Sequence, residues 1–251
     1  MVVREIFSRT ILTKTGISSF DYCVNPYVGC AHGCWYCYAS FMKRFTGHQE
    51  PWGDFVDVKV NAPHLLERQL KRARQGSVIL GSVTDPYQPL EKTYELTRGC
   101  LEAFLECQFD VNLLTRSPLC LRDIDLLKQF KKIEVGFSIA THDEEITKMF
   151  EPHSPSIQSR MEALRTLHNQ KIRTFAFIGP MLPLDPARLV SMLKGIVDEV
   201  LIDRMNYANK VKAIYRRAKL ERYLEDNYFT IFGNDLKERF EKTGIPVTMC
   251  Y

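Results

Sequence analysis

The sequence predicts an α/β protein whose parallel strands and helices close into an incomplete (βα)6-type TIM barrel. Two observations predict this class. The first is that six short apolar, β-rich runs are each followed by a helical pattern, because strands joined through helices pair in parallel by right-handed crossovers. The second is that the 251 residues suit a single barrel, while six units fall short of the eight in a closed one. An open doubly wound sheet is the alternative.

The strands are predicted from short runs of Val, Ile, Leu and Phe, which are typical of buried parallel strands. The first is expected at about 21–28, directly before the densest group of cysteines. The other five strands of the barrel are expected at 78–83, 111–115, 133–139, 172–179 and 197–203. The strand at 78–83 is followed by a turn at Asp85-Pro86.

The helices are predicted between these strands, where apolar residues recur every three or four positions. Met161, Leu164 and Leu167 give one of them a clear apolar face. These helices are expected at about 64–74, 96–107, 119–130, 143–150, 157–169 and 186–196. Residues 207–242 also have helical patterns, and 245–251 are expected to end as a strand.

We therefore expect one domain over residues 1–251, with a core at about 18–203 and a C-terminal helical extension at about 205–251. The chain has 34 Lys and Arg residues against 30 Asp and Glu, a net charge of +4. This balance allows a phosphate-bearing partner without demanding one. No apolar run reaches the roughly 18 residues of a spanning helix, and none near the start resembles a signal peptide. We expect a soluble, cytoplasmic protein with no membrane partner, whose cysteines are reduced thiols or metal ligands.

Cys30, Cys34 and Cys37 follow the first strand with the spacing C-x3-C-x2-C. Thiolates are soft ligands for zinc or iron–sulfur iron, and Gly29 and Gly33 give the backbone the freedom to wrap around such a centre. The spacing alone leaves three alternatives. They are a zinc site completed by Cys23 or His32, a four-cysteine electron-transfer cluster, and a three-cysteine cluster with one open iron.

The segment NPYVGCAHGCWYCYA, with Tyr36 before its last cysteine, resembles the signature of the radical S-adenosylmethionine (SAM) enzyme superfamily. More narrowly, it is similar to the spore photoproduct lyase-related, DNA repair photolyase-like family. Residues 81–98, 137–164 and 177–183 resemble that family as well, so the likeness spans most of residues 20–200.

The resemblance implies a [4Fe–4S] cluster held by Cys30, Cys34 and Cys37, with the fourth iron free to bind SAM. Reductive cleavage of SAM then gives a 5′-deoxyadenosyl radical that abstracts hydrogen from a substrate. An electron donor such as flavodoxin or ferredoxin is implied too. The alternative is a non-catalytic iron–sulfur or zinc module that binds nucleic acid.

Further site residues follow from the same resemblance and from their positions after strands. Thr84 is expected to contact SAM, although a turn role is equally compatible. Arg116 follows the strand at 111–115 and is a candidate for the SAM carboxylate, because guanidinium groups suit carboxylates. Ser138 is a candidate for the ribose, and the backbone of Gly179 for the adenine.

Tyr36 and Tyr38 flank Cys37. Packing around the metal centre is the simpler role for both. The resemblance also allows Tyr36 to contact the cofactor and Tyr38 to act catalytically, as a redox relay near the radical. Glu151 and Arg160 form either an ion pair at the site or a solvated surface pair.

One departure from the family concerns hydrogen return. Spore photoproduct lyases carry a cysteine hydrogen donor after the second strand, whereas residues 81–85 contain Ser82 and no cysteine. A hydroxyl is a much poorer hydrogen-atom donor than a thiol, so we do not expect spore photoproduct repair. Cys100, Cys107 and Cys120 are expected as buried apolar residues of helices, while Cys250 either approaches the site or lies at a frayed end.

Two stretches are rich in basic residues, at 66–74 and 210–222. The second has six basic residues and one acidic residue. It is either a solvated helical face or a phosphate-binding helix with Tyr215 and Tyr223 available for stacking. Its candidate phosphate contacts are Lys210, Lys212, Arg216, Arg217 and Lys219. Nucleic acid is thus one substrate class, and a peptide or small metabolite is another.

Overall fold

The structure is a computed structural model that describes residues 1–251. Its main sheet has eight strands in the order β11-β10-β9-β8-β7-β6-β3-β2, parallel except for the edge strand β2. The strands are β2 (Thr13–Lys14), β3 (Tyr22–Val24), β6 (Ser77–Leu80), β7 (Asp110–Thr115), β8 (Ile133–Ser138), β9 (Arg173–Ile178), β10 (Glu199–Ile202) and β11 (Val247–Met249). From β3 onward the order follows the chain and never reverses, as it would in a doubly wound sheet. The edges β2 and β11 do not pair, so the predicted incomplete barrel is confirmed.

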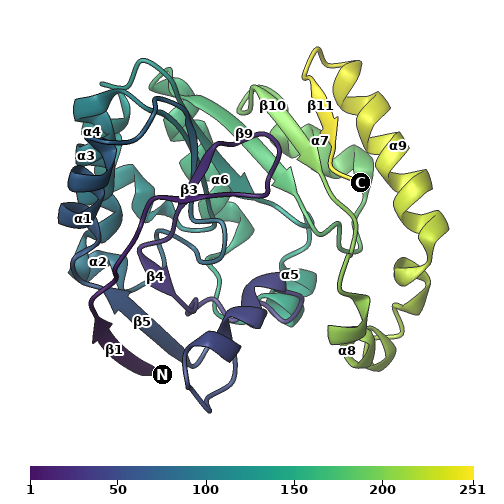
Figure 1. Ribbon diagram of the computed structural model, residues 1–251. Coiled ribbons are helices and arrows are strands. Elements are labelled where there is room, and N and C mark those ends of the chain that lie inside the picture. The colour runs from purple at the N-terminus through teal and green to yellow at the C-terminus, as the bar shows by residue number, and fades with distance from the viewer.

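The helices connect successive strands and cover the sheet (Figure 1). Helices α1, α3 and α4 lie on one side, and α9 lies beside β11 at the far edge. The α-helices are α1 (Ala62–Leu70), α2 (Glu91–Tyr94), α3 (Leu96–Cys107), α4 (Ile124–Leu127), α5 (Glu144–Phe150), α6 (Ile157–Asn169), α7 (Pro186–Leu193), α8 (Lys212–Arg217) and α9 (Asp226–Glu241). Short 3-10 helices are η1 (Tyr38–Phe45), η2 (Pro118–Asp123), η3 (Ala208–Lys210) and η4 (Glu221–Leu224). None of the helices combines the length and apolar character that crossing a membrane requires.

Helix α6 has the predicted bounds, and a local signal fixes its start. The Ser156 side chain accepts a hydrogen bond from the Ser159 amide and so caps the first turn. The helix predicted at 119–130 is instead divided into η2 and α4. Asp123 leaves helical geometry at the junction, with φ −101° and ψ 16°, and its buried carboxylate binds Arg98 and Arg122.

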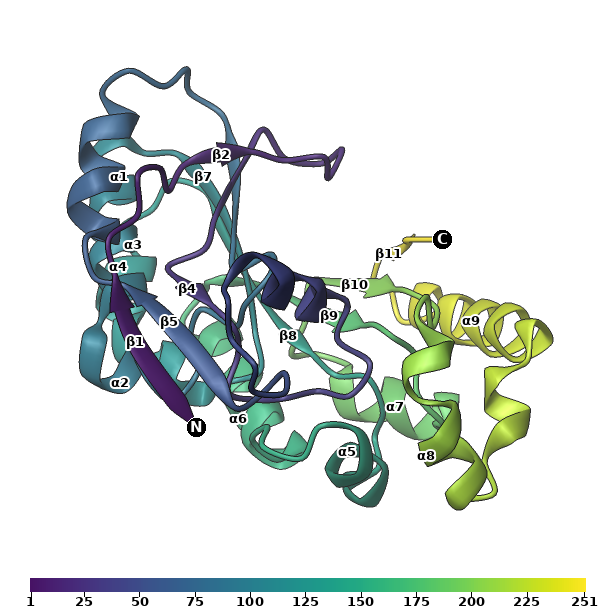
Figure 2. The same ribbon diagram turned by 60° about the horizontal axis from the view of Figure 1, so that its bottom comes forward.

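The strand predicted at 21–28 is divided in two. Pro26 has no amide proton for a sheet, and the Asn25 side chain binds Val83 and Ser82. The chain therefore leaves the barrel after β3 and enters a second, three-stranded sheet of order β1-β5-β4. This sheet, formed by β1 (Val2–Ile6), β4 (Tyr27–Val28) and β5 (Phe55–Lys59), was not predicted. Figure 2 shows β1 and β5 side by side below β4.

The small sheet supports the residues that follow β4. It has its own core, which includes Tyr27, Val56 and Val58. Gly29 has a φ of 92°, and a Cβ atom there would lie 2.4 Å from the Phe55 carbonyl oxygen. Only glycine allows this close approach, so the start of the cysteine-containing segment is fixed against β5.

Candidate active site

The cysteine loop, residues 29–37, connects β4 to η1 at the carboxyl ends of the barrel strands. Two short turns shape it: the Gly33 amide donates to the Cys30 carbonyl at 3.2 Å, and the Cys37 amide to the Cys34 carbonyl at 3.1 Å. Gly33 has a φ of 60°, which glycine adopts without strain. Cys30 and Cys34 are buried, Cys37 is partly buried, and all three are free thiols.

The three thiols fit an iron–sulfur cluster. Burial raises the pKa of all three, that of Cys34 to about 12, and the charges of Cys34 and Cys37 raise the pKa of Cys30 further. Binding iron would therefore release their protons. No three Cys, His, Asp or Glu side chains are grouped to hold a single metal ion. A cluster needs no such convergence, because each thiolate binds a different iron.

The two candidates for a fourth zinc ligand are occupied elsewhere. His32 is buried, with Nε2 3.2 Å from Asp85 Oδ2 and Nδ1 3.3 Å from the His153 carbonyl oxygen. The Cys23 sulfur lies 3.1 Å from Thr13 Oγ1 at the edge of the sheet. Both side chains thus have partners outside the cysteine loop, and this favours three ligands over four.

Thr84 holds the cysteine loop against the end of β6. Its hydroxyl donates to the Gly29 carbonyl at 2.6 Å and accepts from Gln88 Nε2 at 3.1 Å. The Gln88 side chain also accepts from the Ala31 amide at 2.9 Å. Sequence reasoning missed Gln88, which lies four residues after Thr84 in a turn.

Asp85 joins the ends of two strands to the cysteine loop. Its carboxylate accepts hydrogen bonds from the Tyr87 amide, the Thr115 hydroxyl and the Arg116 amide at 2.6–2.9 Å, and it faces His32. Burial raises the pKa of Asp85, but His32 and these donors outweigh it and lower the value to about 2. The sequence indicated only a turn here. The side chain is a buried anion that orients Arg116.

Arg116 lies in a buried polar cluster beside Cys34. Its Nη2 donates to Tyr36 Oη at 3.1 Å, and Tyr36 donates to the Glu151 carboxylate. Arg160 Nη2 contacts Glu151 Oε2 at 2.5 Å. Both Glu151 and Arg160 are at most 2% exposed, so the interpretation of a solvated surface pair is wrong.

The charges of this cluster balance one another. Burial raises the pKa of Glu151, but Arg160 and Arg116 outweigh it and lower the value to about 2. Arg116 Nε is buried without a hydrogen-bond partner, 3.5 Å from a Glu151 oxygen. A buried donor without a partner is costly, and this one lies at the carboxyl end of β7, beside the cysteine loop.

The other predicted site residues, Tyr38, Ser138 and Gly179, differ in how far they are exposed to solvent. Tyr38 is 42% exposed and donates its hydroxyl to the Ser82 carbonyl. Ser138 is buried, and its carbonyl oxygen accepts from Arg160 Nη1 at 3.0 Å. Gly179 follows β9 and precedes a cis peptide bond. A Cβ there would lie 2.3 Å from the Phe177 ring, so Gly179 contacts that ring rather than the cysteine loop.

The remaining cysteines are separate from the cysteine loop. Cys100 and Cys120 are completely buried, as predicted. Cys107 is exposed, so its predicted burial is wrong, because α3 ends there and turns its last residue to solvent. Cys250 is exposed after β11, and its amide donates to the Ile202 carbonyl at 2.8 Å.

The alternative in which Tyr215 and Tyr223 are available for stacking is wrong for Tyr215. Tyr215 is fully buried, with its ring centroid 4.8 Å from that of Phe150. Tyr223 is half-buried and packs edge-on against Tyr228. Their helical spacing could not reveal this, because the rings that cover them come from other elements.

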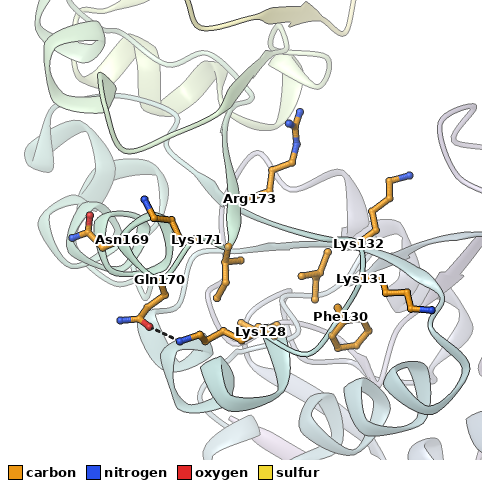
Figure 3. A pocket seen from close by; sticks show the side chains of 11 residues that line it. Lys128, Phe130, Lys131, Lys132, Asn169, Gln170, Lys171 and Arg173 are labelled. Carbon is orange, nitrogen blue, oxygen red and sulfur yellow. Dashed lines mark hydrogen bonds between the residues drawn. The ribbon is translucent and has the colours of Figure 1, made fainter.

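Two hollows lie at opposite ends of the strands. One, of about 480 Å³, adjoins the cysteine loop, since Lys210 in its wall donates to the Cys37 carbonyl at 2.7 Å. The other, of about 600 Å³, lies at the amino ends of β8 and β9 (Figure 3). Its Lys132 and Arg173 pair with Asp110 and Glu134 on neighbouring strands. The smaller hollow is therefore the one next to the candidate chemistry.

Comparison with known proteins agrees with this geometry. The model of the radical SAM superfamily matches residues 24–196. An uncharacterized protein of Methanocaldococcus jannaschii is 34% identical over 226 residues, covering 89% of this chain and 83% of that protein. The radical SAM Nalpha-GlyT isomerase of Pseudomonas phage M6 is 28% identical over 182 residues, covering 72% of this chain and 35% of that protein.

Two solved structures share the fold. Spore photoproduct lyase complexed with dinucleoside spore photoproduct has a TM-score of 0.71 at 14% identity, covering 99% of this chain and 82% of that one. Streptococcus suis SuiB bound to precursor peptide SuiA has a TM-score of 0.62 at 15% identity, covering 90% and 48%. At these identities the likeness establishes the fold, while the sequence matches establish the family. The chain belongs to the radical SAM superfamily of enzymes.

Proposed function

We propose that Cys30, Cys34 and Cys37 hold a [4Fe–4S] cluster with which the protein cleaves SAM for hydrogen abstraction from a substrate. When bound, the cluster supplies the electron that splits the sulfonium into methionine and a 5′-deoxyadenosyl radical. The observation that carries the proposal is a single loop that supplies Cys30 and Cys34, both buried, and the partly buried Cys37, while Cys23 and His32 have partners elsewhere. Three ligands leave one iron of a cubane open. The protein's own part is to bind, orient and exclude water.

The test is anaerobic reconstitution followed by reduction. About four irons and four sulfides per chain are expected, as one cubane requires, and 5′-deoxyadenosine should form slowly even without substrate. A loaded chain that gives no 5′-deoxyadenosine would instead favour the alternative of a non-catalytic nucleic-acid-binding module. We further propose a flavodoxin or ferredoxin as electron donor and a cytoplasmic location, where the eight free thiols stay reduced.

Several residues are proposed to position SAM. Thr84, Ser138 and Gly179 lie at or after the carboxyl ends of strands, the end of the barrel that the cysteine loop occupies. Tyr36 adds an aromatic ring beside Cys34. Tyr38 is proposed as the catalytic redox relay. Burial raises its pKa to about 12, so at neutral pH it keeps the proton that a hydrogen relay needs.

Arg116 is proposed to bind the SAM carboxylate, and replacing it tests this role. Arg116→Ala should weaken SAM binding about 10-fold or more, because a hydrogen bond between charged groups contributes about 1.5–3 kcal/mol. Equilibrium dialysis of the reconstituted protein measures the change, with iron content measured on the same sample. Arg165→Ala, an exposed arginine on α6, is the matched control. Loss of iron in proportion to SAM binding would assign Arg116 to the cluster instead.

The substrate is proposed to be nucleic acid. Helix α8 presents Arg216 and Arg217 to solvent, and 210–222 carries six basic residues. The name of one similar structure, spore photoproduct lyase complexed with a dinucleoside, points in the same direction. The peptide bound to SuiB keeps a peptide substrate as the second candidate.

Salt dependence tests phosphate binding by α8. Affinity for oligonucleotides should fall with salt, with a slope near −0.7 to −0.9 per contacted phosphate. The double variant of Arg216→Ala and Arg217→Ala should reduce the magnitude of that slope by the share of about two phosphates, one for each side chain. Fluorescence anisotropy at several salt concentrations measures it, and an unchanged slope would remove α8 from the binding surface.

Repair of spore photoproduct is not expected. Ser82 occupies the segment where the lyases carry a cysteine, and its Oγ accepts from Asn25 at 3.0 Å. An O–H bond gives up hydrogen to a carbon radical much less readily than an S–H bond. Chromatography of irradiated DNA should therefore detect no restored thymine. Clear restoration would mean that another thiol, such as exposed Cys250, returns the hydrogen.

A further inference from the structure

We propose that a stacking surface beside the cysteine loop binds unpaired nucleotides, with bases against its aromatic rings and phosphates at its two cations. The stacking surface consists of Tyr38, Phe41, Arg44, Phe45, Tyr207 and Lys210. The inference rests on the proposed nucleic-acid substrate and goes beyond it, because it names the strand state that is bound and the residues that bind it.

The rings of the stacking surface are unusually exposed. Phe41 is 41% exposed, Phe45 67% and Tyr207 48%. Of the 15 phenylalanines in the chain, only these two and Phe7 are exposed to this degree. Two of the three thus lie on the eight-residue helix η1. Such a local concentration of exposed rings is typical of a binding surface.

The cations of this surface lie on its rings and face no carboxylate. The Arg44 guanidinium is 5.3 Å from the Phe41 ring centroid and 4.8 Å from that of Phe45. Lys210 Nζ lies 5.0 Å from the Tyr207 ring. The hollow of about 480 Å³, which is lined by all of the stacking surface except Phe45, includes no acidic residue. An anion can therefore approach both cations, and Arg44 is free of any ion pair.

The surface adjoins the proposed chemistry. Helix η1 begins directly after Cys37, and Lys210 donates to the Cys37 carbonyl and to Ser40 Oγ at 2.6 Å. Tyr38 donates to the Ser82 carbonyl just after β6, and Tyr207 follows β10. In both ribbon views η1 lies between β4 and α8 (Figures 1 and 2). A strand lying on this surface would pass the carboxyl ends of the barrel strands.

Rings and cations together favour unpaired nucleotides over a duplex or a peptide. Protein rings can stack only on bases whose faces are free, whereas a duplex stacks its bases on one another. The surface combines rings with cations, and a single strand offers bases to the rings and phosphates to the cations. The four aromatic side chains are more exposed than Tyr215, which is fully buried, and Tyr223, which is half-buried.

Oligonucleotide binding by the reconstituted protein tests the proposal. The probes are a fluorescent 15-residue oligothymidylate, the oligouridylate of equal length and a 15-base-pair duplex, each measured by anisotropy. Both single strands should bind more tightly than the duplex. The double variant of Phe41→Ala and Phe45→Ala should weaken single-strand binding about 10-fold or more, since each stacked base contributes measurably. Arg44→Ala should flatten the salt slope by about 0.7.

Matched controls separate this surface from a general loss of fold. Phe7→Ala removes a ring that is 82% exposed outside the hollow, and Arg165→Ala removes an exposed cation of α6. Both should bind single strands as the unaltered protein does. Iron content and 5′-deoxyadenosine formation are measured on every sample.

The outcomes distinguish this inference from the proposed function. Unchanged affinity in the variants of η1, or equal binding of duplex and single strand, overturns the stacking surface and leaves the nucleic-acid substrate standing. Absence of any oligonucleotide binding at low salt overturns both, while SAM cleavage still tests the enzyme. Normal oligonucleotide binding with slow reduction by flavodoxin in Arg44→Ala would assign the surface to the electron donor instead.

Discussion

Replacing Cys30, Cys34 or Cys37 by alanine is expected to abolish both cluster assembly and the formation of 5′-deoxyadenosine. Each of the three thiols would bind a different iron, and the other candidate ligands, Cys23 and His32, contact Thr13 and Asp85 instead. Loss of one ligand therefore leaves a second iron open and the cubane unstable. Iron and sulfide analysis, the visible absorption of the reconstituted protein, and chromatography of the SAM products measure the two losses.

The controls for this prediction are two other thiols. Cys23→Ala should keep cluster and activity, because the Cys23 sulfur lies beside Thr13 at the edge of the sheet. Cys107→Ala removes an exposed thiol at the end of α3 and should also have no effect. If Cys23 proves as necessary as the other three, a four-cysteine site replaces the open-iron site, and the proposed reaction fails with it.

The barrel could be predicted largely from the sequence because its signals are local. Strands β7, β8 and β9 are short apolar runs, and α3 and α6 begin and end within their predicted bounds. The β1-β5-β4 sheet could not be predicted. Strand β1 is mostly exposed, and its partner β5 lies about fifty residues later in the chain. Such a pairing depends on tertiary contacts rather than on periodicity.

The candidate site, too, could be predicted from the sequence only where its signals are local. The cysteine spacing is a local motif, so the loop and its three thiols could be identified directly. The network of Asp85 and Gln88 depends on contacts between the ends of β6 and β7 and a loop more than fifty residues earlier. Phe150 likewise covers Tyr215 from a different helix. The residue types at these positions indicated turns and stacking, whereas the structure shows side chains that are buried against other elements.

Glu151→Gln is expected to lower the free energy of unfolding by about 3–5 kcal/mol, as breaking a buried ion pair from one side does. The substitution keeps the size of the side chain but leaves Arg160 charged and 1% exposed. It also turns one of the two oxygens that face Tyr36 and Arg160 into an amide donor, and it removes the anion facing Arg116. At about 2–4 °C per kcal/mol for a chain of this size, thermal unfolding should begin roughly 10 °C earlier.

The matched control for this prediction is Glu145→Gln. Glu145 is 83% exposed and pairs with Lys148 at 3.3 Å, and exposed pairs contribute at most about 1 kcal/mol. A loss as small at Glu151 as at Glu145 would mean that water or movement of Arg160 compensates for the missing charge. In that case the buried cluster would not be the rigid support of Arg116 described above.

The pH dependence of stability gives a second, independent measure of the same pair. The pKa of Glu151 is about 2 in the folded protein, against an ordinary value of 4.5. Its contribution to stability is therefore complete above about pH 4.5 and is lost as the pH falls toward 2, because the unfolded chain takes up the proton first. Denaturant unfolding between pH 7 and pH 3 should show this loss in the unaltered protein and a flatter profile in Glu151→Gln. Equal slopes in the two proteins would contradict the lowered pKa of Glu151. A flatter slope in Glu151→Gln, together with the predicted loss of unfolding free energy at pH 7, would identify Glu151 as the anion that holds Arg160 and Arg116 in place beside Cys34.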